Sequence, residues 1–485
     1  NTNIITTYEY EGKKLIKEIN IKNGLEYPTT YEYDSNGLLK KVITFDGIIN
    51  ENEYNDKGTL IKSYTFHKSE PSCKIYSEEK KLDDKGNNKT ELNSFGEEIA
   101  ENNYLDDSGV IVSTNLKNGK TIAYGYDKDD DRLLSASINI DNEVNTNIYG
   151  YNFDMLTTLS HNDFDYDFEY DGFGRQTKID IAGQNYQTVE YAQYTTTITL
   201  ATNEKIIKTY NDDDNLLKLE YIDNSGLRKT IIENIYDTYG TLLKTIDYSN
   251  EDGTINYNFE YDKYGNINNK FYTQNAKDIK IETITNTNKD KTIETITIGS
   301  SKYTTNYEYD KDLNARLNKV NFSDKLFQNI LYDNLGRIKQ TDLSSIFTKK
   351  YSYLQEGDHS SPLIACEWFG DEKINKDNLK YFYDKNGNII SIKENGREIV
   401  RYAYDDISRL IREDNKKLNK TSLFAYDKGG NIIERIEYAY STLSTDNLTN
   451  GVRFAYNYPI SGWRDQLIKY NGESFAYDNL GNPTT

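Results

Sequence analysis

The 485-residue sequence is poor in cysteine and proline. Its two cysteines, Cys73 and Cys366, match neither a metal-site spacing nor a disulfide framework, so we expect two unpaired thiols. The five prolines suit continuous strand pairing, because proline removes a backbone donor. No apolar run approaches the roughly 20 residues of a membrane-spanning helix. The chain starts at Asn1 without a signal peptide, which suggests an excised piece of a longer polypeptide.

Apolar residues are also too few for a solid globule. Only 36% of the residues are hydrophobic, and that count includes 44 tyrosines. An ordinary globular domain is about 45–50% apolar, and a solid body of this length would bury about three-quarters of its surface. The many Tyr, Ile and Leu residues argue equally against disorder. We therefore expect a thin-walled protein with many half-buried residues, a position that suits the amphipathic tyrosine ring.

Positive charge is in deficit. Lys and Arg number 58 against 78 Asp and Glu, which gives a formal net charge of −20. A surface that binds phosphate groups needs the opposite sign, so nucleic acid and anionic membranes are poor partners. The simplest role of this charge is to keep a large surface soluble.

A short motif is repeated along the whole chain. Tyr-Asp occurs twelve times, and in eight copies a glycine stands three residues after the aspartate, far more often than chance allows. We assign these eight copies as structural repeat residues: Tyr33, Asp34, Gly37; Tyr170, Asp171, Gly174; Tyr236, Asp237, Gly240; Tyr261, Asp262, Gly265; Tyr332, Asp333, Gly336; Tyr383, Asp384, Gly387; Tyr426, Asp427, Gly430; and Tyr477, Asp478, Gly481.

The residues of one unit predict a β-hairpin. In 31–39, Tyr31 and Tyr33 stand two apart and face one side of a strand. Asp34 can accept a hydrogen bond from its own backbone two residues on, and Gly37 can supply the positive φ that closes a four-residue loop. A second kind of hairpin is indicated where the sequence that starts at Ile281 recurs at Ile293, around a polar turn at 286–291.

Spacing of the motif sets the expected architecture. Clean copies of the motif recur about every 22 residues, so the chain holds about twenty-two units. The sequence shows almost no helix signal. We predict an all-β fold, in which one long sheet of hairpins coils into a hollow shell or barrel. A flat solenoid and a propeller are the rival geometries. No linker divides the chain, so we treat 1–485 as one continuous unit, with more degenerate repeats over 1–120.

The motif resembles the YD repeat of the Rhs family. The copies at 331–338 and 169–175 carry the pattern, and 461–485, with Trp463, Arg464 and Asp465, is similar to the family segment that leads into its core. The resemblance implies a β-shell, as in bacterial Rhs and wall-associated proteins, the C components of insecticidal toxin complexes, and teneurins. In the bacterial members such a shell encloses a C-terminal toxin.

The family core carries an aspartyl self-cleavage motif of the type Asp-Pro-x-Gly-Leu, which this sequence lacks. The strings at 333–336 and 478–481 have no proline and are ordinary repeats. Neither the cleavage activity nor a toxin is therefore assigned to this chain.

Other active-site signals are weak. His67, His161 and His359 are isolated, and we expect satisfied or exposed loop histidines. The acidic clusters at 127–131, 163–167 and 211–215 are interpreted as charged turns. The first begins like a calcium-binding loop, but Arg132 stands where such a loop needs glycine and Ile138 where it needs glutamate. We assign no catalytic residue, cofactor or metal. Trp368 and Trp463 are the candidates for a sugar platform.

Three functions follow from these observations. The first is a non-catalytic encapsulating shell of a secreted bacterial polymorphic toxin, whose partner is its own C-terminal cargo. The second is a cell-surface adhesin or carbohydrate-binding scaffold with a glycan or receptor partner. The third is a glycan-active enzyme with a carboxylate pair. The Asn-, Lys-, Ile- and Tyr-rich composition suggests an AT-rich, Gram-positive source and a secreted or cell-surface location.

Overall fold

The computed structural model describes residues 4–105, 109–140, 143–250, 253–263, 265–274, 277–285, 291–344, 346–370 and 377–484. These residues form an all-β protein with 42 strands and a single 3-10 turn, η1 (Thr445–Asn447). The described residues contain no α-helix, and hence no helix that is long and apolar enough to span a membrane. The all-β prediction is confirmed.

The strands fall into two windings of one band, defined here by how the chain overlaps itself. The first winding comprises β1 (Ile5–Glu11), β2 (Lys14–Lys22), β3 (Leu25–Tyr33), β4 (Leu39–Ile43), β5 (Ile48–Tyr54), β6 (Leu60–His67), β7 (Glu70–Glu79), β8 (Lys81–Leu82), β9 (Asn88–Leu92), β10 (Glu98–Tyr104), β11 (Ile111–Leu116), β12 (Thr121–Tyr126), β13 (Leu133–Ile140), β14 (Glu143–Asn152), β15 (Met155–His161), β16 (Phe164–Tyr170), β17 (Gln176–Ile181), β18 (Gln184–Tyr191), β19 (Thr195–Leu200), β20 (Lys205–Tyr210), β21 (Leu216–Ile222), β22 (Arg228–Tyr236), β23 (Leu242–Asp247), β24 (Ile255–Tyr261), β25 (Ile267–Gln274), β26 (Lys277–Thr285) and β27 (Lys291–Ile298). The second winding comprises β28 (Ser301–Tyr309), β29 (Leu317–Phe322), β30 (Lys325–Tyr332), β31 (Ile338–Leu343), β32 (Phe347–Glu356), β33 (His359–Gly370), β34 (Asp377–Tyr383), β35 (Ile389–Glu394), β36 (Arg397–Tyr404), β37 (Leu410–Asn415), β38 (Lys420–Tyr426), β39 (Ile432–Ala439), β40 (Val452–Asn457), β41 (Lys469–Tyr470) and β42 (Glu473–Ser474).

Successive strands pair antiparallel in chain order, so the sheet is a long meander of hairpins. The register of β26 and β27 sets Ile279 opposite Ile298 and Thr285 opposite Thr292, as the repeated sequence predicts. The turn itself, at 286–290, lies outside the described residues. Because successive strands run in opposite directions, every second turn lies on the same edge of the band. The Tyr-Asp turns all lie along one of these edges, which we call the YD edge. The other turns form the far edge.

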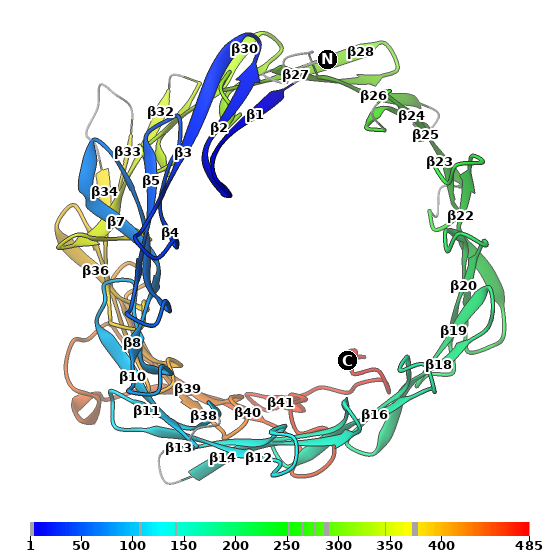
Figure 1. The fold of residues 1–485 in the computed structure, drawn as a ribbon. Coiled ribbons are helices and arrows are strands. Elements are labelled where there is room, and N and C mark those ends of the chain that lie inside the picture. Colours follow the sequence, from blue (N-terminus) through cyan, green and yellow to red (C-terminus); the bar gives the residue numbers. More distant parts are fainter. Residues whose placement is uncertain are drawn as a thin grey trace.

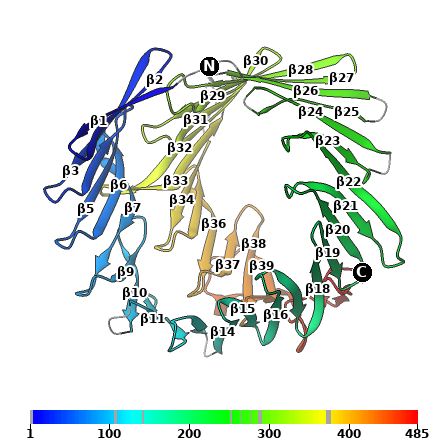
Figure 2. The ribbon, with the colours of Figure 1, turned by 45° about the vertical axis from the view of Figure 1, so that its right-hand side comes forward.

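The band coils into a ring and then overlaps itself. Figure 1 shows the ring, whose middle no ribbon crosses, with β3 to β7 lying beside β32 to β36. Figure 2, turned by 45°, shows the same two windings side by side and the C-terminus near β19. Because a sheet has a built-in twist, a band this long must coil rather than stay flat.

A barrel closed by hydrogen bonds, one form of the prediction, is not what the described strands build. The two ends of the band do not pair with each other. Apart from the ladder between β27 and β28, where the first winding continues into the second, the described strands of the two windings share a single backbone pairing, the parallel bridge of His359 with Lys74 between β33 and β7. Because the coil rises along its axis, the second winding runs beside the first instead of joining end to end with it. The two windings therefore meet through hairpin turns. The backbone groups of these turns already bond within the turns, so they do not form a ladder between the windings.

The wall is as thin as the composition predicts. Within the described residues there is one cluster of buried apolar side chains, formed by Ile49, Tyr64 and Phe66. Most other residues along the strands are half-buried. Such a wall is held by strand pairing and by contacts between neighbouring units.

Candidate functional site: the repeat turn and the seam

Each Tyr-Asp-x-x-Gly copy forms the same tight turn. In the first copy the Asp34 backbone N–H donates to the Leu38 carbonyl at 2.9 Å, and the Gly37 N–H donates to the Asp34 carbonyl at 3.1 Å. Three residues therefore lie inside the closing pair, one fewer than the predicted four-residue loop. Gly37 has φ +85°, the left-handed position that this bulged turn requires. All eight copies share the glycine-to-aspartate bond and a glycine φ between +77° and +92°.

The aspartate side chain holds the turn from within. Asp34 Oδ1 accepts hydrogen bonds from the backbone N–H groups of Asn36 at 2.9 Å and Leu38 at 2.8 Å. In each of the other seven copies, the residue four positions after the motif aspartate donates its backbone N–H to the Oδ1 of that aspartate. Backbone donors that would otherwise need water are thus satisfied inside the loop.

The tyrosine hydroxyl joins each unit to the one before it. Tyr426 donates to the Leu410 carbonyl at 2.7 Å, and Tyr383 donates to the Ile364 carbonyl at 2.8 Å. The other six assigned tyrosines do the same, to the carbonyls of Leu15, Leu156, Leu216, Leu242, Leu317 and Leu467. Burial raises the pKa of Tyr426, which keeps this hydroxyl protonated as a donor.

Degenerate copies, which lack either the aspartate or the glycine of the motif, were not assigned from the sequence but use the same bond. Tyr54, Tyr104, Tyr191, Tyr353 and Tyr404 each donate to a backbone carbonyl of the preceding unit. The Tyr404 turn has Ser408 at φ +67° in place of the glycine. The signal in the sequence that could have identified these copies is a tyrosine at the end of an expected strand, at the spacing of the repeat.

An arginine directly after the positive-φ residue of the turn adds a second link in some copies. Arg409 Nε donates to Asp405 Oδ2 at 2.6 Å, and its guanidinium lies 4.7 Å from the ring centre of Tyr426 in the next unit. Arg337 makes the equivalent contacts with Asp333 and Tyr353. The arginine therefore ties its own turn to the following tyrosine by a cation–π contact.

Where the windings overlap, the YD edge of the second winding lies on the far edge of the first. We call this contact the seam. Its recurrent feature is an asparagine amide of the first winding that donates to the carbonyl of the residue after a turn aspartate. The pairs are Asn93 with Lys385 at 3.0 Å, Asn118 with Asp406 at 2.7 Å, and Asn145 with Lys428.

Ion pairs repeat along the same seam. Lys74 lies 3.1 Å from Asp358, Lys120 lies 3.3 Å from Asp406, and Lys385 lies 3.2 Å from Glu97. The bond from Lys74 lowers the pKa of Asp358. Further along, Lys428 and then Arg464 lower the pKa of Asp163, which both contact.

The three histidines, isolated in sequence, all lie at this seam. His359 stacks on Tyr76 with ring centres 4.0 Å apart, and its Nε2 lies 3.0 Å from Glu79 Oε2 of the first winding. His161 lies 4.0 Å from Asp465 of the second winding. His67 contacts the Asp46 carbonyl at 2.9 Å, and the Asp46 side chain in turn accepts a bond from Asn314 across the seam.

The C-terminal segment closes the end of the seam. Asp465 Oδ1 accepts hydrogen bonds from Asn162 at 2.8 Å and from Asn431 at 2.9 Å. Trp463 makes an edge contact with Tyr186, with ring centres 6.3 Å apart. Trp463 is thus half-buried in packing, and Trp368 is half-buried within β33.

Groups suited to metal binding do not gather in the part of the chain described. No group of three or more His, Cys, Asp or Glu residues there could hold a metal ion. Cys73 and Cys366 are both free thiols, as predicted. Carboxyl groups with a perturbed pKa among these residues, such as Glu79 and Glu220, are shifted downward by their partners.

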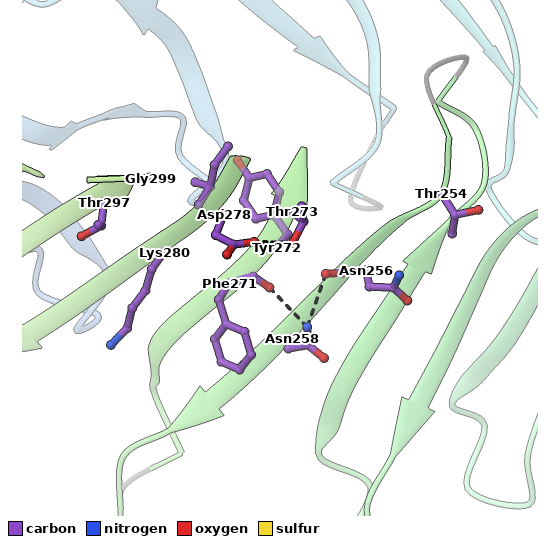
Figure 3. A pocket seen from close by; sticks show the side chains of 11 residues that line it. Thr254, Asn256, Asn258, Phe271, Tyr272, Thr273, Asp278, Lys280, Thr297 and Gly299 are labelled. Carbon is purple, nitrogen blue, oxygen red and sulfur yellow. Dashed lines mark hydrogen bonds between the residues drawn. The ribbon is translucent and has the colours of Figure 1, made fainter. Parts of the chain in front are cut away.

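One hollow on the sheet face is lined by an aromatic ring and polar side chains. It measures about 280 Å³ and is lined by side chains of β24 to β27, among them Asn256, Asn258, Phe271 and Asp278. Figure 3 shows the Phe271 ring beside these polar groups, with Thr273 next to Asp278. Thr273 donates to Asp278 Oδ1 at 2.7 Å.

Comparison with known proteins places the fold. No family model and no curated protein matches the sequence. A crystal structure of TcdB2-TccC3 without its hypervariable C-terminal region matches with a TM-score of 0.54 at 11% identity, over 96% of this chain and 27% of that chain. The chain has the fold of an Rhs-repeat shell protein.

This Rhs-type fold confirms the resemblance drawn from the Tyr-Asp motif. The TcdB2-TccC3-TEV structure covers 99% of this chain and 26% of that chain, with a TM-score of 0.47 at 13% identity. A mutant Photorhabdus luminescens Tc holotoxin pore aligns with 99% of this chain at 10% identity and a TM-score of 0.34. This chain spans about a quarter of the length of the first two solved chains.

Proposed function

We propose that this chain is a non-catalytic wall segment of a secreted bacterial toxin shell, which encloses a cargo carried C-terminal to it. The observation that carries the proposal is the seam. A band that coils once and then bonds edge to edge with itself makes a continuous wall around an interior. The repeat residues assigned above serve as the fasteners of that wall, and residues 1–485 act as one continuous unit, with 461–485 leading toward a core.

Small-angle X-ray scattering tests whether the wall is hollow. A compact globule of this length has a radius of gyration of about 23 Å. We expect a clearly larger value and a distance distribution typical of a shell. A value near that of the compact globule would overturn the proposal.

Sequencing the natural gene past the codon for Thr485 tests the cargo. We expect a frame that continues into an Asp-Pro-x-Gly-Leu core and then an unrelated tail. In the natural polypeptide that tail should resist protease until the shell is unfolded. A stop codon or a wall anchor without such a core would refute the cargo function.

A glycan-binding scaffold is the second candidate. The hollow at Phe271 favours it, because an aromatic ring flanked by amide, hydroxyl and carboxylate groups is suited to a sugar. Titration with N-acetylglucosamine oligomers, followed by NMR, checks this function. Saturable shifts that Phe271→Ala abolishes and Phe327→Ala preserves would support it, and an absence of shifts would remove it. A glycan-active enzyme has no supporting contact in the described residues.

A further inference from the structure

The backbone bridge between β7 and β33 carries a histidine. His359 pairs there with Lys74, and the Lys74 N–H donates to the Asp358 carbonyl at 2.8 Å. The two strands lie beside each other in Figure 1 and in Figure 2. The His359 side chain is 16% exposed and stacks on Tyr76 of β7. A Cβ added at Gly96 would lie 2.8 Å from Nε2, so the turn after β9 also packs against the ring.

Both ring nitrogens of His359 face carboxylate oxygens. Nε2 lies 3.0 Å from Glu79 Oε2 of the first winding, and Nδ1 lies 3.1 Å from Asp358 Oδ1. A neutral imidazole has a proton on one nitrogen and a lone pair on the other, so one of the two carboxylates would face a lone pair. Only the imidazolium, with a proton on each nitrogen, attracts both oxygens. The geometry at His359 therefore matches the protonated ring.

His67, at the same seam, has a different arrangement. Its Nε2 lies 2.9 Å from the Asp46 carbonyl, which needs a donor, and its Nδ1 accepts the backbone N–H of Ser69 at 3.2 Å. A neutral ring with its proton on Nε2 satisfies both partners. The contacts of the two histidines therefore match different charge states.

The charges around His359 balance only when its ring is protonated. The titratable groups around the ring come from β6, β7, β32 and the turn before β33, and are three carboxyl groups, two ammonium groups and a phenol: Glu79, Asp358, Glu356, Lys62, Lys74 and Tyr76. Lys62 lies 2.8 Å from Glu79, and Lys74 lies 3.1 Å from Asp358. The third carboxylate, Glu356, stands opposite His359 in the hairpin register. The imidazolium supplies the positive charge that balances it.

The partners of His359 keep their own charge states while a histidine titrates. Burial alone would raise the pKa of Glu79, but the bonds from Lys62 and His359 lower it. The bond from its lysine partner lowers the pKa of Asp358. The bond from Glu79 raises the pKa of Lys62, and burial raises the pKa of Tyr76. Histidine is the side chain that changes charge between about pH 5 and 8, so His359 is the switching group of this cluster.

We propose that His359 is a proton-dependent latch of the seam. The protonated ring of the second winding holds Glu79 of the first winding. When the ring gives its proton to solvent, one nitrogen presents a lone pair to a carboxylate and the latch opens. Its contribution is present on the acid side of the histidine range, while the carboxylates are ionised, and is lost as the pH rises through that range. The inference holds whatever the shell encloses.

Hydrogen exchange of the full chain at about pH 5.5 and about pH 8.5, on either side of the histidine range, tests the latch. Labelling times are scaled to the intrinsic exchange rates. We expect protection in β7 and β33 to be at least about ten-fold lower at the higher pH, because a charge-assisted bond is lost. Protection in β22 and β23, which lie away from this bridge, should stay the same.

Substitutions separate the charge of the ring from its packing. His359→Gln keeps a hydrogen-bond donor but cannot titrate, so it should give the same low protection at both pH values. His359→Lys carries a permanent charge and should give high protection at both. His67→Gln is the matched control and should keep the pH dependence of the wild type. Glu79→Gln removes the charge from the other winding and should also abolish the dependence. Circular dichroism checks that each variant is folded.

Three results would overturn the proposal. Equal protection of β7 and β33 at both pH values in the wild type removes the latch. A His359→Gln variant that keeps the pH dependence, or a His67→Gln variant that loses it, assigns the effect to another group. A His359→Lys variant that is as poorly protected as His359→Gln shows that the ring acts through its packing and not through its charge.

Discussion

The bond between successive units can be measured by removing one tyrosine hydroxyl. Tyr404 donates to the Ile389 carbonyl at 2.8 Å, so Tyr404→Phe deletes one hydrogen bond and keeps the ring. Burial raises the pKa of Tyr404, so the hydroxyl remains a neutral donor across the physiological range. A neutral hydrogen bond of this kind contributes about 1 kcal/mol.

Repetition makes the effect larger. Tyr383 and Tyr426 make the equivalent bonds in the adjacent units, with different carbonyl partners. Because the three hydroxyls share no acceptor, their losses should add, to about 3 kcal/mol for the triple Phe variant. Through local opening of the sheet, this free energy corresponds to a roughly hundred-fold loss in the protection of the backbone amides against hydrogen exchange.

Hydrogen exchange followed by mass spectrometry reads this opening strand by strand. We expect faster exchange from β35 to β39 and unchanged exchange in β15 to β20. Tyr239→Phe is the matched control, because Tyr239 is 92% exposed. Unchanged protection in the triple variant, or an equal loss in Tyr239→Phe, would refute the view that these hydroxyls fasten the units.

Other perturbations test the turn and the seam. Gly387→Ala should cost about 1–2 kcal/mol in thermal or denaturant unfolding, since Gly387 has φ +86°. The control Gly172→Ala should be neutral, because no atom lies within 4 Å of the added carbon and its φ is ordinary. Gly429→Ala should open the seam, because its Cβ would overlap Asn162, and the resulting rise in exchange should be confined to β15, β16, β38 and β39. Acid should also loosen the seam, because Asp358 and Asp163 have a lowered pKa in the folded chain. The stability that their ion pairs contribute is full above about pH 4, the ordinary carboxyl range, and is lost as the pH falls below it. Scattering should therefore report an unchanged shape from neutral pH to about pH 5 and expansion below about pH 4, and expansion already at pH 6 would contradict this assignment.

The sequence by itself determined the unit. Asp34 and Gly37 act on backbone atoms within a few residues, so their effect is local and is visible as a pattern. The period then predicted a single long meander of hairpins. The size of the loop was missed by one residue, because the pairing of Asp34 with Leu38 depends on which backbone groups close the turn.

Only the tertiary structure decided how the windings meet. The seam joins residues 264 to 303 positions apart, as in Asn334 with Glu70 and Asn162 with Asp465. That separation depends on the accumulated twist and rise of every preceding strand, which no local motif encodes. Asn118 looks like any other asparagine in the chain, and it becomes a seam residue only because the coil brings the Asp406 carbonyl to it. The hydroxyl partners of the tyrosines depend on a nearer contact, since a strand end finds its acceptor only after the neighbouring unit has paired.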